Sequence, residues 1–80
     1  MDDAKILQQI NELAREEHEL FERESHAQAS EADRRRLQTI GVTLDQCWDL
    51  LRQRRAKREA GRDPDEAQLR DERTVEGYTA

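Results

Sequence analysis

Residues 37–51 read LQTIGVTLDQCWDLL, and apolar side chains recur along this stretch at alternating steps of three and four. The recurring positions are Leu37, Ile40, Leu44, Cys47 and Leu51. Steps of three and four place side chains on one stripe of an α-helix, whereas a strand would show alternation with a period of two. The stretch therefore predicts a helix with a single apolar seam.

A second helix of the same kind precedes it in the chain. Its seam consists of Ile6, Ile10, Leu13 and Leu20. Beside this seam, a row of residues repeats every seven positions at Leu7, Ala14 and Phe21. Asp2 or Asp3 can cap the start of this first helix, and Ser30 with Asp33 resembles a capping box for the second. Both helices therefore have a start signal as well as a seam.

Two long helices joined by a short connection are most simply an antiparallel hairpin. We expect an all-α, coiled-coil-like hairpin over residues 1–61, with helices at about 3–25 and 31–60. Gly61 suits the left-handed residue that follows a helix end. Residues 62–80 are expected to hold a short helix or helical turn and an irregular tail.

The position of the turn sets which residues face each other. If the turn centres near Gln28, facing residues have numbers that sum to about 57. Ile10 then lies opposite Cys47, so that apolar meets apolar in the seam. The same register places Arg54 and Arg55 beside Asp2 and Asp3.

Composition excludes several classes of protein. Charged residues make up 41% of the chain, hydrophobic residues 34%, and the formal net charge is -5. This is too little apolar surface for a globular core, and the negative charge argues against a surface that binds nucleic acid or anionic membrane throughout. No apolar run approaches the roughly 20 residues of a membrane span, and the acidic start MDDAKILQQI does not resemble a signal peptide. We therefore expect a cytoplasmic protein.

The apolar residues beside the seams predict an association surface. A two-helix hairpin buries only one side of each helix, so flanking apolar residues stay partly exposed in a monomer. The expected surface consists of Leu7, Ala14, Phe21, Trp48 and Leu51. We expect this surface to form a homodimer, as a four-helix bundle, or to pack on a different protein.

The second helix is basic and the first is acidic. Residues 31–60 carry eight cations against five anions, and residues 1–30 carry three against eight. Antiparallel pairing gives the cations partners, so charge would mainly set the orientation of the helices. The alternative is a nucleic-acid- or ribosome-associated factor that grips phosphates with the free end of the second helix. The possible phosphate contacts are Arg52, Arg54, Arg55, Lys57 and Arg58.

Neither a catalytic site nor a metal site is expected. His18 and His26 each follow an arginine by three positions, where a di-iron helix needs a glutamate. One cysteine cannot build a thiolate metal site, and Cys47 at a seam position is typical of a small buried hydrophobe. Two helices also lack a pocket in which the pKa values of carboxylates can separate. We therefore expect a non-enzymatic protein without a cofactor or a small-molecule substrate.

The tail has no periodic pattern, so it is either disordered or docked through Val75 and Tyr78. One hypothesis is that it folds back on the second helix. Val75 and Tyr78 would then cover Trp48 or Leu51.

Four short motifs resemble those of a known family. They read REEHEL at 15–20, LDQCWDLLRQRRAKREAG at 44–61, DPDEA at 63–67 and VEGY at 75–78. Together they resemble a family of small, mostly actinobacterial proteins, domain of unknown function 2630. The resemblance implies a bacterial protein and implies no activity. It also implies a surface role for Glu16, Glu17, His18 and Tyr78.

Overall fold

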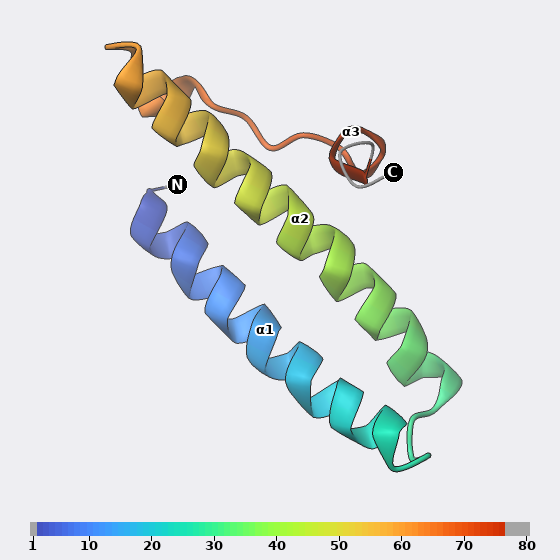
Figure 1. Ribbon diagram of the computed structural model, residues 1–80. Helices are drawn as coiled ribbons and strands as arrows, with labels where there is room; N and C mark the ends of the chain where they lie inside the picture. The colour runs from blue at the N-terminus through green and yellow to red at the C-terminus, as the bar shows by residue number, and fades with distance from the viewer. Residues whose placement is uncertain (1, 77–80) are drawn as a thin grey trace.

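The protein is a helical hairpin with a C-terminal segment that returns along its second helix (Figure 1). The structure, a computed structural model, describes residues 2–76. Its elements are α1 (Asp3–Ser25), α2 (Glu31–Glu59), the 3-10 turn η1 (Pro64–Glu66) and α3 (Glu72–Glu76). The predicted all-α hairpin with a short C-terminal helix is confirmed, and both long helices begin and end within one residue of their expected positions.

The predicted capping residues begin both long helices. Asp2 accepts a hydrogen bond from the backbone amide of Lys5 at 2.9 Å. Ser30 Oγ accepts a hydrogen bond from the amide of Asp33, and the Asp33 carboxylate accepts one from the amide of Ser30, both at 3.1 Å. These bonds satisfy amides that have no partner within the first turn of a helix. Local sequence therefore determines where the helices start.

Both long helices end in the same left-handed motif. After α2, Gly61 has a φ of 71°, and the amide of Arg62 donates to the carbonyl of Lys57 at 2.8 Å. After α1, the equivalent residue is Ala27 with a φ of 57°, and the amide of Gln28 donates to the carbonyl five residues earlier at 2.7 Å. Glycine adopts this conformation freely, whereas the Cβ of alanine crowds the following carbonyl. The connection between α1 and α2 is therefore strained at Ala27.

We expect the variant Ala27→Gly to raise the free energy of unfolding by about 0.5–1 kcal/mol, because glycine relieves this crowding. The reciprocal variant Gly61→Ala should lower it by about 1 kcal/mol for the same reason. Urea denaturation followed by circular dichroism measures both changes. A less stable Ala27→Gly protein would contradict a left-handed residue at this position.

The core lies in the seam between α1 and α2. Its centre is formed by Ile6, Ile10, Cys47 and Leu50, against which the partly buried Leu44, Leu51 and Ala67 pack. Ile10 and Cys47, which were expected to face each other, lie in this one cluster. Ala67 comes from the segment that follows α2, so a third piece of chain completes the core of the hairpin.

Residues 62–71, here named the strap, are held on α2 by side-chain amides. Gln53 holds the backbone of Gln68: its Nε2 donates to the carbonyl at 2.7 Å and its Oε1 accepts from the amide at 3.4 Å. Two turns earlier on α2, Gln46 Nε2 donates to the carbonyl of Arg70 at 3.1 Å. These side chains supply partners for a stretch of chain that lies mostly outside regular secondary structure.

Asp49 anchors the same contacts from within α2. Its side chain is buried, accepts a hydrogen bond from Gln53 Nε2 at 2.8 Å and lies 3.6 Å from Nε of Arg70. Burial of a carboxylate requires such partners. Asp49 therefore orients Gln53 toward the strap and draws Arg70 to α2.

We expect Gln53→Ala to speed hydrogen exchange at the amide of Gln68 by about tenfold, because this change removes both bonds to the strap backbone. Exchange is read by NMR or mass spectrometry at neutral pH. The matched control is Gln8→Ala, since Gln8 hydrogen-bonds to Glu12 on the exposed surface of α1. Equal exchange in the parent and Gln53→Ala proteins would show that other contacts hold the strap.

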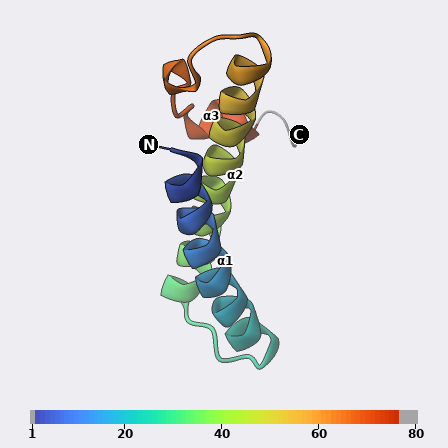
Figure 2. The same cartoon turned by 90° about the vertical axis from the view of Figure 1, so that its left-hand side faces the viewer.

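α3 packs against the middle of α2, as Figures 1 and 2 show from two directions. Val75 is buried there, so the tail docks through this residue. Up to residue 76 the tail does not cover Trp48, which stays 45% exposed. The strap is bonded to Gln46, and Trp48 lies about 200° further round the helix. Tyr78, the other residue of the docking hypothesis, lies outside the described residues.

Candidate interaction surface

One long side of the hairpin carries apolar residues of both helices. In a right-handed helix, the residue after a seam residue lies about 100° further round. Because α1 and α2 are antiparallel, this rotation leads to the same side of the hairpin in both helices. Leu7 follows the fully buried Ile6, and Trp48 follows the buried Cys47. We name this side the open face and define it by Leu7, Ala14, Phe21, Gly41 and Trp48.

The large side chains of the open face are well exposed. Phe21 is 52% exposed, Trp48 45% and Leu7 43%. Single exposed apolar residues are common on proteins, but several on one side of a molecule this small indicate a surface that packs on another molecule. Four of the five residues predicted for association thus share one side, and their role in association stays a prediction.

Leu51, the fifth residue of the predicted surface, lies elsewhere. It is partly buried and packs against the cluster formed by Ile6, Ile10, Cys47 and Leu50. It therefore belongs to the core of the hairpin and is removed from the candidate surface.

An open groove of about 550 Å³ lies at one end of the open face. Phe21 of α1 lines one wall, α3 lines the other, and α2 provides a floor that includes Leu37, Gly41 and Val42. A Cβ added at Gly41 would have no neighbour within 4 Å in the part of the chain that the structure describes, so the groove is open at this point. α3 therefore shapes one end of the open face.

The rim of the groove is acidic. Its carboxylates are Glu17, Glu24, Asp45, Glu72 and Glu76, beside a single cation, Arg34. A hydrogen bond with Asp45 and burial raise the pKa of Glu76, and Glu72 adds a smaller repulsion. Like charges are thus crowded along this rim, which favours a cationic partner.

The other end of the open face is apolar and basic. Arg52 and Arg55 follow Trp48 by four and seven residues, so the three side chains lie on one stripe of α2. Arg52 is exposed and makes no ion pair within residues 2–76. Arg55 lies 3.7 Å from Glu59 on its own helix. The Trp48 side chain thus lies beside two exposed cations.

Arg54 is buried, which corrects its assignment as a possible phosphate contact. It is 7% exposed, and its Nε and Nη1 lie 2.5 Å and 2.9 Å from carboxylate oxygens of Asp3 and Asp65. Arg54 is seven residues after Cys47 and Asp3 seven before Ile10, so the pair continues the seam by one layer. The guanidinium therefore joins α1, α2 and η1.

Two further cations at this end already have carboxylate partners. Arg58 lies 2.9 Å from Asp3, and Lys57 lies 3.9 Å from Glu66. Hydrogen bonds from Arg54 first, and then from Arg58, hold the pKa of Asp3 below its ordinary value. Of the five cations of the predicted phosphate contact, Arg54 is thus buried, and Lys57 and Arg58 pair with carboxylates of other segments. Arg52 and Arg55 are exposed and have no such partner outside α2 within residues 2–76.

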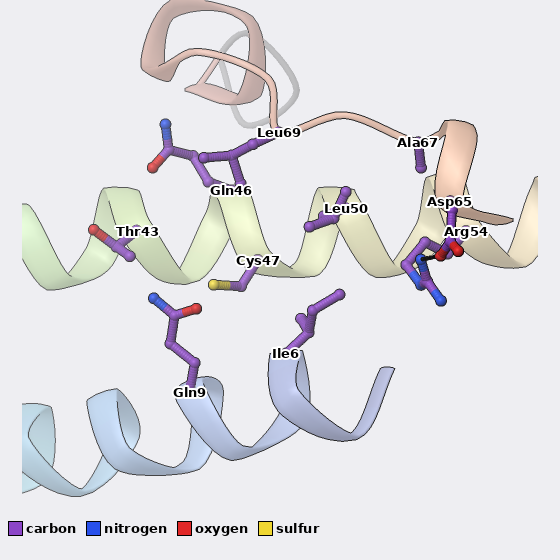
Figure 3. A pocket seen from close by; sticks show the side chains of 10 residues that line it. All are labelled: Ile6, Gln9, Thr43, Gln46, Cys47, Leu50, Arg54, Asp65, Ala67 and Leu69. Atoms are coloured by element: carbon purple, nitrogen blue, oxygen red, sulfur yellow. Dashed lines mark hydrogen bonds and ion pairs between the residues drawn. The ribbon is translucent and has the colours of Figure 1, made fainter. Parts of the chain in front are cut away.

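A second cavity, of about 460 Å³, lies between α1, α2 and the strap (Figure 3). Its lining includes Ile6, Cys47, Leu50 and, from the strap, Ala67. Burial raises the pKa of the Cys47 thiol, which keeps it protonated at neutral pH. The carboxylate that lines this cavity belongs to Asp65, which Arg54 already engages. The arrangement thus offers apolar surface and a protonated thiol.

The surface residues implied by the family resemblance have separate environments. Glu16 accepts two hydrogen bonds from Arg36, at 2.7 Å and 3.0 Å, and these lower its pKa. His18 is exposed and lies 3.3 Å from Glu22. Glu17 lines the groove, and Tyr78 lies outside the described residues. Among these residues, Glu17 is the one that belongs to the candidate surface.

Comparison with known proteins agrees with the motif resemblance. The model of the family described as "Protein of unknown function (DUF2630)" matches residues 2–80. The chain belongs to this family. Similar relatives are the uncharacterized proteins Mb0922c of Mycobacterium bovis and Rv0898c of Mycobacterium tuberculosis, each 47% identical over 78 residues. The aligned region covers 96% of this chain and 90% of each relative.

No solved structure matches the chain. None of the helices within residues 2–76 is long and apolar enough to cross a membrane. The family assignment thus implies no activity, and the proposed function is inferred from the surface of the protein.

Proposed function

We propose that this family member is a small, non-enzymatic interaction protein of the bacterial cytoplasm that self-associates through its open face. The observation that carries the proposal is the exposure of Leu7, Phe21 and Trp48 on one side of a hairpin that is otherwise highly charged. Complete burial of such a side chain stabilises an association by about 1.5–3 kcal/mol. A homodimer that packs two open faces together would form a four-helix bundle, in which this apolar surface leaves water.

The alternative, a nucleic-acid-associated factor, has weaker support. Arg54 is buried, and Lys57 and Arg58 already lie beside carboxylates of other segments. Arg52 and Arg55 remain exposed, but the open face that they border also carries the acidic groove. A phosphate backbone would meet repulsion along that part of the face.

Light scattering across a concentration series tests self-association. At high concentration we expect twice the chain mass of 9.4 kDa, and we expect the dimer to persist in high salt because apolar packing drives it. The double variant Leu7→Ser and Trp48→Ser should raise the dissociation constant at least about tenfold. The control is Leu69→Ser, since Leu69 is exposed on the strap and not on the open face. A mass of one chain at every concentration would refute the proposal.

A salt titration tests the alternative, a nucleic-acid-associated factor. Binding of a labelled single-stranded RNA or duplex DNA is measured by fluorescence anisotropy between about 50 and 200 mM salt. Contacts with several phosphates would give an affinity that falls steeply with salt. We expect the parent protein to show no binding that is lost in the double variant Arg52→Ala and Arg55→Ala. Salt-sensitive binding lost in that variant would favour the nucleic-acid function.

A further inference from the structure

We propose that the two ends of the open face are complementary, so that Trp48 and Leu7 of one copy dock into the acidic groove of a second copy that runs in the opposite direction. This inference rests on the proposed function and adds the geometry of the dimer. The occupant of the groove is thus a second copy of this chain. An interface of this kind has a twofold axis and repeats the same contact twice.

The apolar row on α1 is symmetric about Ala14. Leu7 and Phe21 lie seven residues on either side of it, or about 10.5 Å along the helix. A twofold axis that crosses the open face at Ala14 therefore brings Leu7 of one copy to the level of Phe21 of the other. The small side chain of Ala14 lies where the two α1 helices approach most closely.

The same axis brings Trp48 to the groove. In the hairpin register, Trp48 lies level with about residue 9 of α1, five residues from Ala14. The axis moves it to the level of about residue 19, next to the positions that Leu37 and Gly41 occupy in the groove of the second copy. The bulky side chains at one end of the open face thus reach the concave part at the other end.

Gly41 provides the space that an indole ring needs. A glycine within a 29-residue helix weakens that helix, and the Cβ of any other residue here would point into open space. Nothing within residues 2–76 therefore requires a glycine at this position. A side chain from a second copy would use the space that the missing Cβ leaves, and the groove volume of about 550 Å³ accommodates it.

Charge supports the same pairing. The cations Arg52 and Arg55 flank Trp48, and the groove that receives it carries five carboxylates on its rim against one arginine. The twofold axis places Arg52 at the level of about residue 23 of the second copy, next to Glu24. Cations from a second copy would relieve the repulsion among Asp45, Glu72 and Glu76. Opposite charges at the two ends also disfavour the arrangement in which like ends meet.

Disulfide trapping in the full-length chain tests this geometry. In a Cys47→Ala background, which removes the native thiol, we expect Ala14→Cys to form a covalent dimer under mild oxidation, because the residue lies at the axis. An equal mixture of Leu7→Cys and Phe21→Cys proteins should form the mixed dimer, while either protein alone should cross-link at least tenfold more slowly. A Leu7→Cys protein that cross-links to itself as readily as the mixture would overturn the inference.

Filling the groove provides a second test. Gly41→Leu should fold, since the position is open and leucine favours a helix, but it should raise the dimer dissociation constant at least tenfold. Circular dichroism confirms folding, and Leu69→Ala on the strap is the matched control. If the parent protein is monomeric, the proposed function fails together with this inference. If it is a dimer that Gly41→Leu leaves intact, only the present arrangement fails.

Discussion

Replacing Arg54 by methionine should lower the midpoint of thermal unfolding by about 10 °C, because the change removes a nearly buried cation that holds three segments together. Asp3 at the start of α1 and Asp65 in η1 would lose their common partner. Methionine keeps much of the packing volume of the arginine stem, so the loss reports mainly the charge and its hydrogen bonds. Differential scanning calorimetry measures the midpoint.

The matched control is Arg52→Met, two residues away on the same helix. Arg52 is exposed and makes no ion pair within residues 2–76, so its replacement should move the midpoint by less than about 2 °C at concentrations where the chain is monomeric. Equal effects of the two substitutions would refute the structural role of Arg54.

The contribution of Arg54 should also depend on pH. The pKa of Asp3 is lowered in the folded protein, mainly by Arg54 and then by Arg58. A carboxyl group with a lowered folded-state pKa stabilises the fold above its unfolded value of about 4, and this contribution is lost as the pH falls through the lowered value. The stability difference between the parent and Arg54→Met proteins should therefore be full at pH 5–7 and narrow below about pH 4.

Shortening Ile6 to alanine should lower the free energy of unfolding by about 2–4 kcal/mol, because the residue is fully buried in the core cluster. In a chain of 80 residues this is a large fraction of the total stability, and the midpoint of thermal unfolding should fall by at least about 8 °C. Urea denaturation with a two-state fit gives the free energy.

Leu69→Ala provides the comparison for Ile6→Ala. Leu69 is 60% exposed on the strap, so truncating it should change stability by less than about 0.5 kcal/mol. Comparable losses from the two truncations would place Leu69 in the core and contradict the described position of the strap.

The sequence predicted the hairpin because its signals are local. Seam residues at steps of three and four, the capping box of Ser30 and Asp33, and the left-handed Gly61 each act within a few residues of chain. The register followed from the length of the connection, and it correctly placed Arg54 beside Asp3. It did not reveal that Arg54 is buried, because η1 covers this side chain only after the chain has turned back.

The contacts of the strap were missed for a related reason. Gln46, Asp49 and Gln53 follow the spacing of one helix face, which is a weak signal for a face that binds something polar. Polar side chains at that spacing usually face water, and only the returning chain provides the backbone groups that they bind. The position of α3 beside the groove, away from Trp48, depends on these same contacts.

The sequence by itself thus determined the two helices, their ends, their antiparallel pairing and the apolar row at Leu7, Ala14 and Phe21, since each follows from helical periodicity. The tertiary structure decided which residues remain accessible. In the folded chain Leu51 lies in the core and Arg54 lies in an ion-pair cluster. A groove forms between α1, α2 and α3. Exposure depends on which distant segments pack together, so a pattern within one helix cannot specify it.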